Sequence, residues 1–408
     1  MKPSNQQLTS LTKNHLSIYQ KKLKTISKSK SHFKSLKTLQ AQLAILKKYD
    51  PLHWFCLSQA EKLLHLSTLK TYGLRDEFTE IDNLIFEGWN QSEFAFNFLS
   101  FLNKGKSLAF AHKACLKIFD QHLTTLFERH LLLKNSTHPH YRPQVAFGEK
   151  QTRKGIQTLL SCYFMVDKKK IKLFGNTLSN LKSHSLRIEH ALRIIKRHSP
   201  DAWSRFCSFT DVIVPIDQEE FVSFSEQVLP GYSMLNLFNR DFVDLMDDLI
   251  HENGHHHLNF YLNQKKLIQE PLDEIYYSPW RRTLRPLRGI YHAYFTFFWA
   301  FELFKDLSIT PELDSIWYLF NASEKEKIYW RAVEEFHMLN YTFEDLKWAK
   351  SRKLISSEGW KLVELQQREL MKAKPFILKL EKRLRAYRKD LTQLKKTLKQ
   401  ARKEYSLV

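Results

Sequence analysis

Between Asp241 and Gln264 the sequence reads FVDLMDDLIHENGHHHLNFYL, and its apolar residues recur with the period of an α-helix. This stretch places His251, Glu252 and His255 in the spacing H-E-x-x-H. Residues four apart lie roughly 40° apart around a helix, so both imidazoles can reach one divalent metal ion, with the glutamate beside its open coordination positions. The sequence therefore predicts a helix that carries a metal centre, and a metalloenzyme.

Other polar residues of the same helix are expected to support this centre or to lie away from it. Asp244 and Asp248 continue the stripe of the two ligands, so their carboxylates could orient the ring nitrogens that do not bind metal. His256 and His257 point roughly 100° and 200° away from His255, which favours ordinary polar or core roles for them.

The net charge of +21 at pH 7 is concentrated at the two ends of the 408-residue chain. Residues 1–50 hold 11 lysines and one acid, and residues 361–408 hold 15 Lys or Arg and five acids. Such basic termini could contact an acidic partner or nucleic acid, and a solvated lysine-rich surface is the equally weighted alternative. The cysteines are single and widely spaced, the N-terminus lacks the apolar core of a signal peptide, and no stretch predicts a transmembrane segment; a reducing cytoplasm is the expected location.

The pattern along the chain predicts three parts. Residues 1–140 read as a helical N-terminal region with a basic arm, 150–356 as the catalytic domain, and 359–408 as a basic C-terminal long helix. In the middle part, short strands are expected before the H-E-x-x-H helix, and two helical segments, about 322–339 and 342–356, are expected near its end. A heptad seam from Ile377 to Tyr405 is typical of a coiled coil or a helical hairpin and leaves a homodimer through these heptads open.

Two histidines need a third ligand, for which the sequence offers two candidates. Glu274 follows His255 with eighteen residues between, a spacing that resembles that of gluzincin metallopeptidases, where the third ligand is a glutamate. His292 lies near the start of the next predicted helix, on a face that could turn toward the first helix. Both candidates stay open at this point.

The segment after the H-E-x-x-H helix resembles the HExxH peptide-modification family. The resemblance covers about residues 185–305 and rests on the order H-E-x-x-H followed by Y-x-P-W-R-x-x-x-R-P-L-x-G-x-x-H, which is formed by Tyr277, Pro279, Trp280, Arg281, Arg285, Pro286, Leu287, Gly289 and His292. The chain departs from the usual acidic pair after the first arginine, with Arg282 and Thr283 there. The resemblance implies an Fe(II)- and α-ketoglutarate-dependent oxygenase that hydroxylates a peptide or protein at an unactivated carbon.

Under this interpretation His251, His255 and His292 hold iron, Glu252 positions substrate or water, and Arg281 or Arg285 binds the distal carboxylate of α-ketoglutarate. A guanidinium suits that carboxylate because it can bind it bidentately. The peptide is expected to lie extended along a short strand, with Tyr232–Phe238 as the first choice.

The expected fold is mainly α (α+β), with a zincin-like catalytic core in which a small sheet lies beside the H-E-x-x-H helix, a helical N-terminal region and a C-terminal coiled-coil-like helix. One alternative function is a zinc metallopeptidase with His251, His255 and Glu274 as ligands and Glu252 as general base. A second alternative is an inactive helical adaptor that binds partners through its basic ends.

Overall fold

The computed structural model describes residues 178–405 except 211, 217–218, 220, 226–230, 263–264, 270–272, 274 and 312–313, and it places three short strands before them. This part is mainly helical, with a small sheet, as expected. The predicted helical region of residues 1–140 and the N-terminal basic arm lie outside the described residues. None of the helices in the described part is both long and apolar enough to cross a membrane.

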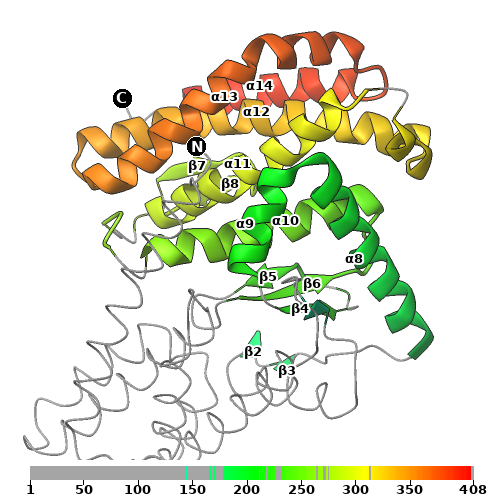
Figure 1. Ribbon diagram of the computed structural model, residues 1–408. Helices are drawn as coiled ribbons and strands as arrows, with labels where there is room; N and C mark the ends of the chain where they lie inside the picture. The colour runs from blue at the N-terminus through cyan, green and yellow to red at the C-terminus, as the bar shows by residue number, and fades with distance from the viewer. Residues whose placement is uncertain are drawn as a thin grey trace, which may run out of the picture.

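Figure 1 shows the helices stacked in layers above the main sheet. The strands are β1 (Gln144–Val145), β2 (Met165–Val166), β3 (Lys169–Lys170), β4 (Val212–Ile216), β5 (Phe224–Ser225), β6 (Tyr232–Asn236), β7 (Tyr276–Ser278) and β8 (Thr283–Arg285). The helices are α8 (Leu178–His198), α9 (Pro200–Phe209), α10 (Phe242–Leu262), α11 (Leu287–Ile309), α12 (Ala322–Ser351), α13 (Ser357–Arg383) and α14 (Arg388–Glu404), with a 3-10 turn η2 (Ser315–Leu319).

The main sheet has the strand order β1-β4-β6-β5, and α10 lies over it. Strands β4 and β6 run parallel, with Val212 opposite Tyr232, and β5 pairs antiparallel with β6. All five residues of β6 are buried, as expected for an internal strand covered on its faces. His256 ties α10 to β6, because its Nδ1 accepts from the backbone N–H of Gly231 at 3.3 Å and its Nε2 lies 3.2 Å from Ser233 Oγ.

This order corrects the choice of strand for the expected peptide. Tyr232–Phe238 was expected to offer a free edge, but β6 pairs with β4 on one side and with β5 on the other. Periodicity alone cannot tell an internal strand from an edge strand, since both present buried apolar residues. On this side of the sheet the outermost strand is β5.

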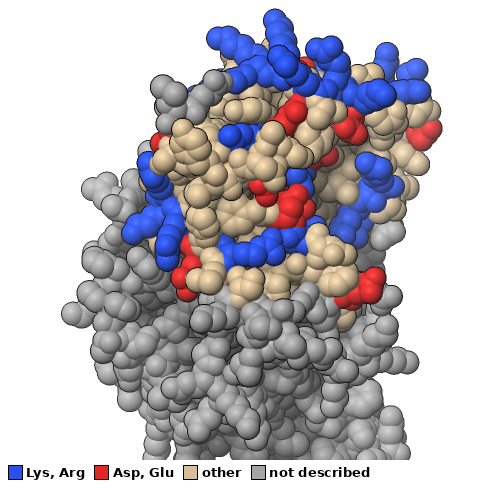
Figure 2. All heavy atoms as spheres, turned by 90° about the vertical axis from the view of Figure 1, so that its right-hand side faces the viewer, with Lys and Arg blue, Asp and Glu red and all other residues tan. Residues whose placement is uncertain are grey.

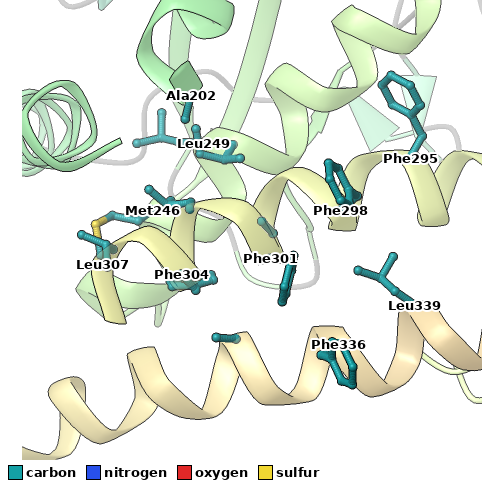
Figure 3. Packing of buried hydrophobic residues seen from close by; sticks show 14 of the residues in the cluster. Ala202, Met246, Leu249, Phe295, Phe298, Phe301, Phe304, Leu307, Phe336 and Leu339 are labelled. Carbon is teal, nitrogen blue, oxygen red and sulfur yellow. The ribbon is translucent and has the colours of Figure 1, made fainter. Parts of the chain in front are cut away.

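An aromatic core holds α11 between α10 and α12. Figure 3 shows phenylalanines from one face of α11 packed between apolar residues of the two neighbouring helices: Phe298, Phe301 and Phe304 with Met246, Leu249, Phe336 and Leu339. These side chains are buried, and Phe301 and Phe304 are 0% exposed. Close packing of such large side chains fixes the position of α11, and hence of any residue on it, relative to α10.

The region predicted as two helices, 322–339 and 342–356, is mainly one helix, α12, that ends at Ser351. Asn321 and Glu324 form a capping box at its start. No break occurs at the expected position because Asn340 donates to the carbonyl of Phe336 and Thr342 donates to that of Met338, so the polar side chains are satisfied inside the helix.

The C-terminal basic segment forms two helices, α13 and α14, that fold back on each other as a hairpin (Figure 1), and not one long helix. Much of the heptad seam is buried within this chain, including Ile377, Leu380, Leu384, Leu398 and Ala401. A homodimer would therefore need a surface other than these buried positions. In Figure 2, Lys and Arg side chains gather at the top of the molecule, where this hairpin lies. Binding of an acidic partner or nucleic acid there stays a prediction.

Candidate metal centre

The two histidines of the H-E-x-x-H string point their rings at each other. Both lie on α10, and the Nε2 atoms of His251 and His255 are 3.2 Å apart. Metal–nitrogen bonds of about 2.0–2.1 Å at tetrahedral or octahedral angles would put two ligand nitrogens roughly 3.0–3.4 Å apart. The pair therefore fits the separation that a shared metal ion requires.

Both rings are held in the neutral form, which is the form that binds metal. Burial, helped by the positive charges of Arg331 and Arg281, lowers the pKa of His251 to about 3. Burial also holds the pKa of His255 well below its usual value, with smaller effects from His251, His256 and Arg281. Lone pairs on these nitrogens are thus available at neutral pH.

His292 is the third histidine that the fold brings to this place. It lies on α11, and its ring centroid is 5.9 Å from that of His255. Among the described residues its buried Nε2 has no hydrogen-bond partner, and burial and His255 together hold its pKa well below the usual value. Within the described ranges, however, no three His, Cys, Asp or Glu side chains are grouped so as to hold a metal ion. The described side chains thus bring two candidate ligand nitrogens together, those of His251 and His255, and do not group His292 with them as a third.

Glu274, the other candidate ligand, lies outside the described residues. Its neighbours Asp273 and Ile275 are exposed. Both His292 and Glu274 therefore remain candidates for the third metal ligand.

Glu252 is turned from the histidine pair toward the sheet. Its side chain is buried, and its Oε2 accepts a hydrogen bond from Ser225 Oγ at 2.7 Å. Because Ser225 belongs to β5, the outermost strand on this side, Glu252 connects the metal helix with that edge. A carboxylate at this point can orient a polar group that enters between β5 and α10.

The two candidate arginines occupy different surroundings. Both are exposed and lie in the hairpin of β7 and β8, Arg281 in its turn and Arg285 at the end of β8. Arg281 is close enough to the histidine pair to lower the pKa of both rings. Arg285 instead lies over the start of α11, where a Cβ at Gly289 would be 3.1 Å from its Nε. The structure therefore brings Arg281, but not Arg285, toward the histidines.

Asp244 and Asp248 do not orient the histidine rings as expected. Asp244 pairs with Lys327 at 2.7 Å, and Asp248 accepts from Ser223 and pairs with Arg240. The carboxylate nearest along the helix to His251 on the inner side is Asp247, one turn earlier, and it pairs with Arg331 of α12. The helical period alone could have suggested Asp247, since it precedes His251 by four residues.

Sequence reasoning missed an aromatic wall beside His251. The ring of Phe297 lies 4.2 Å from that of His251, and Trp280 stacks on Phe297 at 4.7 Å with an interplanar angle of 5°. Phe297 belongs to the apolar run of α11, where one aromatic residue among many gives no indication that it lies beside a functional site. This wall shields one side of the candidate centre from water.

Comparison with protein-family models and with curated proteins finds no match to this sequence. The chemistry of the centre is therefore argued from its own residues.

Proposed function

We propose that this protein is an Fe(II)- and α-ketoglutarate-dependent oxygenase that hydroxylates a peptide or protein at an unactivated carbon. The observation that carries the proposal is the convergence of the His251 and His255 Nε2 atoms, with the unpartnered Nε2 of His292 nearby. Three neutral imidazoles on one side of an ion leave other coordination positions open, as iron oxygenases require for a chelating 2-oxo acid. When bound, the iron would activate O2, which is the oxidant: one oxygen atom would go to the peptide carbon, and the other to the 2-oxo acid as it is converted to succinate and CO2.

Arg281 is the residue that we assign to the distal carboxylate of α-ketoglutarate. Its side chain is exposed in the turn of the β7–β8 hairpin, and its charge reaches the histidine pair. A guanidinium can hold a carboxylate through two parallel hydrogen bonds. Arg285, which was the second candidate, becomes the matched control.

Glu252 and β5 are the groups that we assign to the peptide. β5 is the last strand in the order of the described sheet, beside the metal helix, and a peptide that lies extended along such a strand is held through its main chain. Ser225 holds the Glu252 carboxylate at this edge, where it can orient the peptide or a water molecule. Main-chain pairing grips a peptide without reading its sequence, which leaves selection to nearby side chains.

The zinc metallopeptidase is the alternative that the same histidine pair permits. In that case Glu274 replaces His292 as the third ligand, and Glu252 acts as general base for a zinc-bound water. A peptidase has no use for Arg281 as a partner of a 2-oxo acid. The inactive adaptor gives no reason for two partly buried, neutral imidazoles to face each other.

Metal analysis and turnover of the full chain test the proposal. Protein purified without oxygen should take up one equivalent of Fe(II) and bind α-ketoglutarate, and it should release succinate when O2 and its peptide are then added. His255→Ala should lose all three properties and serves as the control. Zinc retained through purification together with peptide cleavage would support the peptidase in its place.

A further inference from the structure

A buried ion cluster joins α12 to the helix that carries the histidine pair. Arg331 lies at its centre and pairs with Asp247 of α10, with Glu334, and with Glu335 at 2.7 Å. The Glu335 side chain is 0% exposed. Although burial opposes it, the three carboxylates hold the pKa of Arg331 well above its usual value. Removing one partner from such a cluster leaves a buried charge uncompensated, so its geometry is strongly held.

The cluster also holds the turn that carries Arg281. The second carboxylate oxygen of Glu335 accepts a hydrogen bond of 2.7 Å from Nε1 of Trp280, the residue before Arg281. The turn bends back through Arg282, whose φ is 53°, in the left-handed region that few non-glycine residues adopt. A fixed anchor at Trp280 therefore determines where the turn begins.

The contacts continue from Trp280 to the metal helix. Trp280 lies flat on Phe297, and Phe297 packs on the ring of His251. His251 Nδ1 is buried and has no hydrogen-bond partner among the described residues, so no hydrogen bond at that atom fixes the ring. The orientation of the His251 ring therefore depends on the contact of its Nε2 with His255 Nε2 and on its packing against Phe297, which Trp280 supports from the other side.

We propose that Glu335 and Trp280 are positioning residues, which hold the His251 imidazole in its ligand orientation through the stacked ring of Phe297. They do so in place of the carboxylate or carbonyl that usually fixes a metal-binding histidine by a hydrogen bond. Because Trp280 and Arg281 are adjacent, the same anchor sets the distance between the histidine and the arginine. The assignment of His251 as a ligand rests on the proposed function, whereas the fixed ring orientation does not.

The test compares Trp280→Phe with Trp317→Phe in the full chain. Phenylalanine at 280 keeps an aromatic ring on Phe297 but removes the hydrogen bond to Glu335. Trp317 provides the matched control, because its Nε1 donates a hydrogen bond of 2.9 Å to the carbonyl of Pro311, in η2 and away from the histidines. Glu335→Gln is the second variant, since it keeps one acceptor oxygen for Trp280 while it replaces the oxygen that pairs with Arg331 by an amide NH2 group.

Two readouts separate the positioning role from the metal role. In metal-free protein, the NMR signal of the His251 Cε1–H group should shift in Trp280→Phe, because the ring current of Phe297 acts on it, and should shift less in Glu335→Gln and not in Trp317→Phe. With Co²⁺ as probe, Trp280→Phe should bind roughly tenfold or more weakly, with a changed visible absorption band, as expected for loss of an outer-shell support.

An unchanged His251 signal in Trp280→Phe overturns the positioning proposal, whatever the metal data show. An equal shift in Trp317→Phe also overturns it, since the effect would then be general. If the signal shifts as expected but the parent protein binds no Co²⁺, the positioning role stands and the proposed function fails.

Discussion

Gly254 of α10 and Thr296 of α11 meet where the two helices cross, and a Cβ at position 254 would lie 3.1 Å from the Cα of Thr296. The glycine thus permits a backbone approach that a larger residue would block. Because His255 follows Gly254 and His292 precedes Thr296 by one turn, this crossing brings the two histidines together. The two helices that carry the candidate ligands can approach this closely because position 254 is a glycine.

We expect Gly254→Val to disrupt this crossing. A branched side chain would overlap Thr296 and push α11 away, which costs on the order of 1–3 kcal/mol of unfolding free energy for an overpacked core. Binding of Co²⁺ should weaken as well, because His292 moves with α11. Urea unfolding and a Co²⁺ titration measure the two effects.

Gly289→Val is the control for a glycine in the next helix, where the near neighbour is the flexible side chain of Arg285. Equal metal affinity in Gly254→Val and the parent would contradict the role of the crossing.

The ligands themselves give the second prediction. His251→Ala and His255→Ala should each abolish metal binding and leave the helical content unchanged, since both rings lie on the partly exposed side of α10. Metal content after dialysis and far-ultraviolet circular dichroism measure these outcomes. His292→Ala should reduce metal affinity more than Glu274→Ala does. The reverse order would favour the peptidase.

Much of the fold around the centre could be predicted from local pattern. The helical periodicity placed α10 and α11, and the short strands expected before α10 include β6. The convergence of His251 with His255 also follows from the period of a helix. The pairing order of the strands could not be predicted in this way, because it depends on which strands meet in space, and so the free edge was assigned to β6 in place of β5.

The supporting groups of the centre were harder to predict than its ligands. Asp244 and Asp248 share the stripe of the histidines, yet cations from α12 and from the loop before α10 bind them. Arg331 and Glu335 lie more than 75 residues beyond His251, and a charged pair four apart on a helix usually indicates a solvated surface. Only the packing of α12 on α10 turns this pair into a buried cluster.

The buried, neutral histidines predict a dependence of stability on pH. Burial lowers the pKa of His256 to about 3, against an opposing hydrogen bond with Tyr232. Between about pH 3 and about pH 6.5 the His256 imidazole is protonated in the unfolded chain and neutral in the folded chain. The free energy of unfolding should therefore fall as the pH drops below about 6.5. Each such histidine should contribute about 1.4 kcal/mol per pH unit within that window. Urea unfolding of metal-free protein at pH 7 and pH 5.5 measures the slope. His256→Gln, which cannot take up a proton, should have a smaller slope, and an equal slope would contradict the assignment.

The two arginines of the hairpin give the prediction that separates an oxygenase from a peptidase. If Arg281 holds the distal carboxylate of α-ketoglutarate, Arg281→Leu removes a charge-assisted bidentate contact that typically contributes about 1.5–3 kcal/mol. The affinity for α-ketoglutarate should then fall by roughly one to two orders of magnitude, at about 1.4 kcal/mol per tenfold, while iron content stays the same. Arg285→Leu is the matched control, because Arg285 lies over Gly289 and not beside the histidines. Calorimetric titration of α-ketoglutarate into the Fe(II)-loaded parent and both variants provides the comparison. A larger loss in Arg285→Leu than in Arg281→Leu would reverse the assignment of the two arginines, and a parent that does not bind α-ketoglutarate at millimolar concentration would exclude the oxygenase.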